Sequence, residues 1–108
     1  MPFNVFLTND ATHDLEELYE YIVQHDVPGN ADYVLTQIEK VFSSLSEAPD
    51  RGVFPKELLS LGIREFREVF FKPYRIIYRV IGDAAYVYLI ADGRRDMQTL
   101  LERRLIRG

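Results

Sequence analysis

The chain has 108 residues, enough for one packed core, and we expect a single domain over residues 1–108. It contains no cysteine, which excludes disulfides and thiolate metal sites, and its two histidines are too few and too widely spaced for a metal centre. Its 13 Lys and Arg against 17 Asp and Glu give a net charge of −4, which argues against a non-specific nucleic-acid binder.

The charge is unevenly distributed along the chain. Residues 1–50 hold ten acids and one base, whereas residues 51–108 hold seven acids and twelve bases. The basic half is the place to look for an anionic or protein partner. We expect no membrane segment and no signal peptide, because no apolar run is long enough for either. This composition is typical of a cytoplasmic protein.

The first half predicts a strand and two helices. Residues 2–8 alternate as a strand does, and residues 11–24 carry a single apolar stripe, as an amphipathic helix does. Thr8, Asn9 and Asp10 are candidate caps of this helix. A Pro-Gly break precedes a second periodic stretch over residues 31–45, so the two helices form a hairpin.

The second half predicts three strands and a last helix. An irregular segment, residues 50–62, leads into strands at 63–71, 74–81 and 85–91, and a helix follows at 97–106 with Asp96 as its cap. The fold class is α+β, in the order β-α-α-β-β-β-α. We expect the first strand to return beside a later one in a four-stranded, mostly antiparallel sheet, with helices over one face and the other face open.

A tight turn at Lys72-Pro73 sets a register in which Phe70 lies opposite Arg75 and Phe66 opposite Arg79. Side chains alternate between the two faces of a strand. One face of this hairpin is therefore apolar and forms the core, while the other mixes arginines with flat apolar groups. We expect this second face to point outward.

Arginine and tyrosine are the residues that carry candidate chemistry. The chain has no Gly-rich phosphate loop and none of the HExxH, GxSxG or Cys–His patterns, so we expect no cofactor and no metal. Clustered arginines can stabilise charge on a phosphate, grip RNA together with tyrosine rings, or form hot spots in a protein interface. Composition alone leaves these three uses open.

The order of elements and several local segments resemble the ParE/RelE superfamily, the toxins of type II toxin–antitoxin modules. The resemblance spans almost the whole chain. It rests on ATHDLEELYEYI after the opening strand, on a second helix ending in LSEAP, and on REFREVFFKPYRIIYRV followed by YVYLIADGRRDMQTLLERRL. It implies a small cytoplasmic toxin that a cognate antitoxin neutralises. RelE-like members cut messenger RNA on the ribosome, whereas ParE-like members poison DNA gyrase.

The sequence favours the ParE side of this resemblance. Residues 49–61 carry only Arg51 and Lys56, where ribosome-dependent relatives are richer in lysine, and no His or Tyr follows the last strand. The expected contacts to gyrase or antitoxin are Lys72, Arg75, Arg79, Arg94 and Arg95. If the chain is instead a metal-independent endoribonuclease acting on the ribosome and mRNA, its catalytic groups are Arg67, Glu68, Arg75 and Arg94. A third alternative is a degenerate member that only binds its antitoxin.

Overall fold

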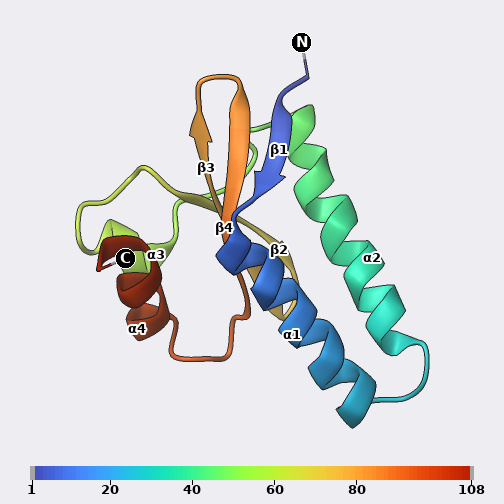
Figure 1. Cartoon of the computed structure of the whole chain (residues 1–108). Helices are drawn as coiled ribbons and strands as arrows, with labels where there is room; N and C mark the ends of the chain where they lie inside the picture. The colour runs from blue at the N-terminus through green and yellow to red at the C-terminus, as the bar shows by residue number, and fades with distance from the viewer. Residues whose placement is uncertain (1, 108) are drawn as a thin grey trace.

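The computed structural model describes residues 2–107 and contains one four-stranded sheet (Figure 1). The strands are β1 (Asn4–Leu7), β2 (Arg67–Phe71), β3 (Tyr74–Ile81) and β4 (Ala84–Asp92), in the order β1-β4-β3-β2. The first strand runs parallel to β4 and the other neighbours are antiparallel, which confirms the expected mixed sheet. The predicted register is also confirmed, with Phe70 opposite Arg75.

Two long helices form the predicted hairpin: α1 (Asn9–His25) and α2 (Asn30–Ser43), the latter followed by the short 3-10 helix η1 (Ser44–Ser46). The first helix begins where it does because the Thr8 hydroxyl accepts a hydrogen bond from the Ala11 amide at 3.1 Å. In Figure 1 the two helices run side by side along one flank of the sheet. Their apolar stripes face it.

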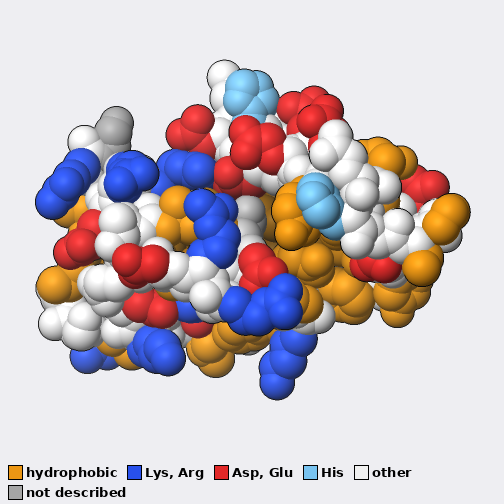
Figure 2. All heavy atoms as spheres, turned by 90° about the horizontal axis from the view of Figure 1, so that it is seen from below, with side chains coloured by type: hydrophobic (Ala, Val, Ile, Leu, Met, Phe, Trp, Pro, Cys, Tyr) orange, Lys and Arg blue, Asp and Glu red, His pale blue; other side chains and the backbone are white. Residues whose placement is uncertain are grey.

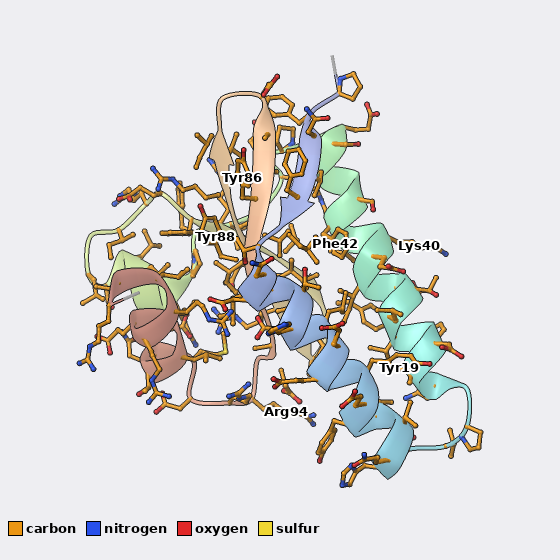
Figure 3. The ribbon with its side chains drawn as sticks, in the orientation of Figure 1. Tyr19, Lys40, Phe42, Tyr86, Tyr88 and Arg94 are labelled. Carbon is orange, nitrogen blue, oxygen red and sulfur yellow. The ribbon has the colours of Figure 1, made fainter. Side chains whose placement is uncertain are left out.

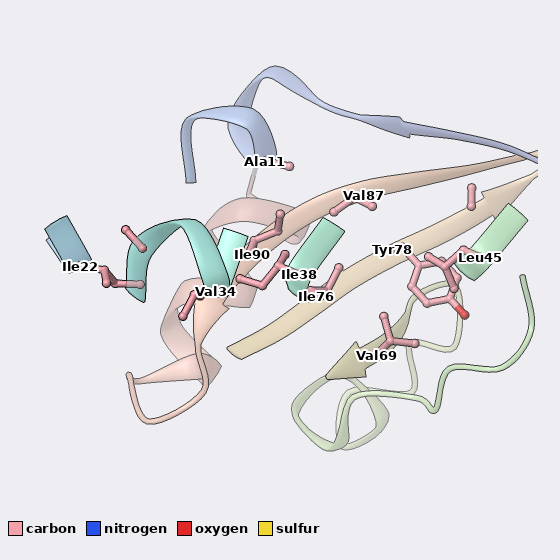
Figure 4. Packing of buried hydrophobic residues seen from close by; sticks show 12 residues of the cluster. Ala11, Ile22, Val34, Ile38, Leu45, Val69, Ile76, Tyr78, Val87 and Ile90 are labelled. Carbon is pink, nitrogen blue, oxygen red and sulfur yellow. The ribbon is translucent and has the colours of Figure 1, made fainter. Parts of the chain in front are cut away.

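The main core lies between this helical hairpin and the sheet (Figure 4). Its sheet side includes Ile76, Tyr78 and Val87, all fully buried, and its helix side includes Ile38 and Leu45. This is the face that alternation predicts to be apolar. Burying each such side chain stabilises the fold by about 1.5–3 kcal/mol.

The opposite face of the sheet is covered at the end that contains Arg75, so the prediction that this face is open is wrong there. It is covered by α3 (Lys56–Leu59), α4 (Met97–Leu101) and the π-helical turn η2 (Glu102–Ile106). A second apolar cluster fills the space between, with Leu58 and Leu101 packed on Ile77 and Leu89. The cover forms because the segment predicted to be irregular contributes Leu58, which is fully buried.

The C-terminal helix, meaning α4 and η2 together, begins at the predicted cap. The Asp96 carboxylate accepts a hydrogen bond from the Thr99 amide at 3.2 Å. The second strand begins at Arg67, later than residue 63, so Arg64 lies in the connection that precedes it. Over residues 2–107 no helix has the length and apolar character needed to cross a membrane.

Candidate functional site

Arg75 lies inside the protein, in a cluster with two carboxylates. Its Nε donates to Glu68 Oε1 at 2.7 Å, and its Nη1 and Nη2 donate to the two oxygens of Glu57 at 2.9 and 2.7 Å. All three side chains are at most 10% exposed. The expectation that Arg75 points outward is therefore wrong. We call Glu57, Glu68 and Arg75 the buried ion cluster.

The two carboxylates of the buried ion cluster differ electrostatically. Hydrogen bonds from Arg75 lower the pKa of Glu57, whereas burial raises the pKa of Glu68 despite the same guanidinium. Both carboxylates in turn raise the pKa of Arg75, which stays charged. One guanidinium thus offsets two carboxylates in a nearly dry site. Removing one member of the cluster is costly, because the remaining charge is then buried without a partner.

The four groups expected of a ribonuclease do not converge. Glu68 and Arg75 bind each other in the buried ion cluster. Arg67 donates to the Gly52 carbonyl at 2.8 Å, and its guanidinium lies 4.6 Å from the Phe54 ring centroid. Arg94 forms a salt bridge with Asp92 at 2.6 Å. Each of these side chains already has an intramolecular partner.

Three of the expected binding residues come together at one end of the sheet. Arg94 and Arg95 line a cleft of about 420 Å³ between α1 and the ends of β3 and β4, together with Tyr74. The Gly93 amide donates to the Pro73 carbonyl at 2.8 Å, which holds the turn carrying Lys72 beside the segment carrying Arg94. We call Lys72, Arg94 and Arg95 the basic end. All three are exposed, and Figure 3 shows Arg94 at this end.

Two groups in the cleft beside the basic end, the Tyr74 hydroxyl and the Asp92 carboxyl, have shifted pKa values. Burial raises the pKa of Tyr74, with a smaller contribution from the negative charge of Asp92. Hydrogen bonds from Arg94 lower the pKa of Asp92. The Arg94 side chain is 77% exposed, so a partner can reach its guanidinium while it stays paired with Asp92. The cleft offers two arginines and two tyrosine rings to a binding partner, and three carboxylates line it as well: Asp14, Glu17 and Asp92.

Arg79 lies at the other end of β3, in a row of side chains that crosses β1, β4 and β3 and ends at Phe66, just before β2. Phe6 pairs with Tyr86, and Tyr86 with Arg79, in the strand register. The Phe6 and Tyr86 rings stack at 5.5 Å, and the Arg79 guanidinium lies 5.9 Å from the Phe66 ring centroid. We call Phe6, Tyr86, Arg79 and Phe66 the aromatic row. Within residues 2–107 Arg79 forms no salt bridge.

Sequence reasoning missed two functional or structural partners. Glu57 sits in a segment with no periodic pattern, and nothing local indicates that it meets Arg75. Asp14 lies among several acids of the first helix, and nothing local distinguishes it, yet it accepts hydrogen bonds from Arg104 and from the Ile90 amide. Among the described residues, no group of three or more His, Cys, Asp or Glu could hold a metal ion.

Comparisons with known proteins give a consistent result. A family model described as the ParE toxin of the type II toxin–antitoxin system, parDE, matches residues 5–97. Toxin ParE3 of Caulobacter vibrioides is 28% identical over 100 residues, which cover 93% of this chain and 96% of that protein.

Solved structures share the fold at low sequence identity. The chromosomal ParDE system of P. aeruginosa matches with a TM-score of 0.69 at 18% identity, over 83% of this chain and 95% of that one. The toxin–antitoxin complex RelBE2 of Mycobacterium tuberculosis gives 0.60 at 21% identity, over 85% and 92%. A mutant of E. coli toxin RelE in the free state gives 0.63 at 14%, over 97% and 100%. The fold is thus shared by both branches of the superfamily.

Proposed function

From the premise that the chain belongs to the ParE toxin family of type II toxin–antitoxin systems, we propose that it inhibits DNA gyrase by protein–protein contact. A cognate antitoxin neutralises it. The proposed contacts to gyrase are the basic end (Lys72, Arg94 and Arg95) and Arg79 of the aromatic row. Because gyrase acts on the chromosome, the proposed site of action is the cytoplasm.

One observation supports a binding role over ribonuclease chemistry. Cleavage of RNA without a metal needs several cations and a base around one phosphate. Here Arg67, Glu68 and Arg75 are engaged within the protein and do not share a cleft with Arg94. Arg94 and Arg95 of the basic end instead share a cleft with Tyr74, and Arg79, at the other end of β3, lies beside Phe66. Arginines next to aromatic side chains are typical of interface hot spots.

The test is expression of the toxin in cells, followed by assays with purified gyrase. We expect DNA damage signalling, filamentation and loss of supercoiling while messenger RNA stays intact. In vitro, the purified chain should inhibit supercoiling by gyrase. Codon-positioned cuts in translated messages, with gyrase unaffected, would replace this proposal with the RelE-like endoribonuclease.

Variants of the basic end test the proposed contacts. Lys72→Ala combined with Arg94→Ala and Arg95→Ala should weaken gyrase inhibition about tenfold or more, because hot-spot arginines dominate interface energies. Lys40→Ala combined with Arg64→Ala is the matched control, since both residues are exposed cations elsewhere on the chain. Equal inhibition by both variants would remove the basic end from the interface.

A further inference from the structure

An acidic groove runs between the two long helices, on the side away from the sheet. Its volume is about 710 Å³, and Leu15 and Leu35 give it an apolar lining. Five carboxylates line it and no lysine or arginine does: Glu16, Glu17, Glu20, Asp32 and Glu39. The Tyr19 hydroxyl donates to Asp32 at 2.7 Å across the groove, which ties α1 to α2 there. We call this feature the acidic groove.

The same chain carries a surface of complementary chemistry on its C-terminal helix. Arg103, Ile106 and Arg107 are exposed, the first two in the π-helical turn η2 and the third as its C-cap, so they lie close together at the end of the chain. Ile106 is 48% exposed, so an apolar side chain lies between the two arginines and is available for contact. We call these three residues the cationic face.

The cationic face is held rigidly, because the other side of the helix is anchored. Met97 and Leu101 are buried against the sheet, and Arg104 binds Asp14 of α1 through two hydrogen bonds of 2.9 and 3.0 Å. A preformed face loses little entropy when it docks. Figure 2 shows Asp and Glu side chains grouped near the top of the view, while Lys and Arg side chains lie mostly on the left and below, with some acids among them. The charge of the molecule is therefore uneven, as the ten acids and one base of residues 1–50 predict.

We propose that the cationic face of one copy of this chain docks into the acidic groove of a second copy. Ile106 would contact the apolar lining, while Arg103 and Arg107 meet the carboxylates at the rims. The chain itself supplies both surfaces, which is why a second copy is the occupant that the charges favour. An amphipathic helix in a hydrophobic groove is a recurrent mode of recognition.

The proposed contact is heterologous, because two different surfaces meet. The cationic face has three side chains, whereas a standard stable interface has roughly 20–30 residues a side, so we expect weak and concentration-dependent association. Much of its strength is electrostatic and lies near solvent. Salt therefore weakens it, since the Debye length falls from about 10 Å at 0.1 M to roughly 3 Å at 1 M.

The test is sedimentation equilibrium of the purified chain at 50 and 500 mM NaCl over a range of concentrations. At low salt we expect the weight-average mass to rise above that of the monomer with concentration. At high salt we expect the apparent dissociation constant to increase about tenfold or more. A chain that stays monomeric at low salt up to the highest soluble concentration overturns the proposal.

Charge-reversal variants test the acidic groove and the cationic face one at a time. Glu16→Lys with Glu20→Lys should abolish self-association, and so should Arg103→Glu with Arg107→Glu. An equimolar mixture of the two variants should associate again, because one retains the cationic face and the other the acidic groove. Glu47→Lys with Glu65→Lys, at exposed acids outside the groove, is the control that should associate like the original chain. Unchanged association in both reversed variants, or no association in their mixture while the control associates, overturns the proposal.

Discussion

Asp14 in α1 and Arg104 in the C-terminal helix form a bidentate salt bridge with hydrogen bonds of 2.9 and 3.0 Å, although they are 90 residues apart in the sequence. Asp14 also accepts from the Ile90 amide at 3.0 Å, and Arg104 donates to the Tyr88 carbonyl at 2.9 Å. The pair therefore fastens the C-terminal helix to both α1 and β4. Together with the longer Arg104–Asp10 pair at 3.8 Å, it joins the two layers that cover opposite faces of the sheet.

Breaking this pair should loosen the C-terminal helix. Arg104→Ala is expected to lower the free energy of unfolding by about 1–3 kcal/mol, because it leaves a largely buried carboxylate with fewer donors. Chemical denaturation measures this loss, and amide hydrogen exchange should be faster over residues 97–106. Arg103→Ala is the control, since Arg103 is the adjacent arginine and its side chain is exposed. Equal effects of the two substitutions would mean that the pair contributes nothing specific.

Arg75 is expected to be the most costly arginine to replace. Arg75→Met fills much of the same space but leaves Glu57 and Glu68 buried without their guanidinium. Removing one partner of a buried ion pair typically costs about 3–5 kcal/mol. That is a large share of the roughly 5–15 kcal/mol by which a domain is stable. Urea denaturation compares this variant with Arg64→Met, and similar midpoints for both would contradict the prediction.

The two carboxylates of the buried ion cluster should change stability in opposite directions with pH. The pKa of Glu57 is lowered from its ordinary value of 4.5, so its stabilising contribution is present above 4.5 and is lost as the pH falls through its folded value. The pKa of Glu68 is raised from 4.5, so its contribution is present below 4.5 and is lost as the pH rises through its folded value.

Substitution by glutamine makes these two directions measurable. Glu57→Gln should destabilise the protein most near pH 7 and less as the solution is acidified below pH 4.5. Glu68→Gln should gain stability relative to the original chain as the pH rises above 4.5, because glutamine needs no buried charge. The measurement is the free energy of unfolding between pH 3 and pH 8. Parallel curves for the two variants would contradict the assignment.

Local patterns in the sequence predicted much of the fold. The alternation in residues 74–81 gave the apolar face of β3 correctly, and the turn at Lys72-Pro73 gave the register of Phe70 and Arg75. The prediction for the opposite face was wrong, because the helices that cover it are held there by contacts between residues distant in sequence. Leu58 and Glu57 lie in a segment without periodicity, yet they bury Ile77 and neutralise Arg75.

The residues of the candidate site show the same difference between features set by local sequence and features set by distant contacts. Lys72, Arg94 and Arg95 are exposed as expected, because turn residues lie at the surface whatever the packing. Arg75 and Arg79 are four residues apart on one strand, so alternation alone places them on the same face and predicts the same environment. Their environments differ, because the C-terminal helix and α3 cover only the end of the sheet that contains Arg75. How far a covering helix reaches along a strand is a tertiary property that strand periodicity does not encode.

Gly52 should not tolerate a side chain. A Cβ at this position would lie 2.6 Å from the Tyr78 hydroxyl and 2.8 Å from the Glu68 carbonyl oxygen, closer than packed atoms approach. The buried Tyr78 hydroxyl accepts from the Gly52 amide at 3.0 Å and donates to the Pro49 carbonyl at 2.6 Å. Gly52→Ala is expected to cost about 1–3 kcal/mol by overpacking. Thermal denaturation checks it, with Ser60→Ala in an exposed turn as control.

Substitution of Arg79 should weaken partner binding, whereas substitution of Arg75 should lower stability. Arg79 is half-buried in the aromatic row and has no carboxylate partner among residues 2–107, so Arg79→Ala is expected to change the free energy of unfolding by less than about 1 kcal/mol. Its unpaired charge beside Tyr86 and Phe66 is suited to an interface, so the same variant should bind gyrase or the antitoxin about tenfold more weakly. Arg75→Ala should instead destabilise the fold. Calorimetric titrations and denaturation curves on both variants give the comparison. If Arg79→Ala bound both partners like the original chain, the aromatic row would be no part of either interface.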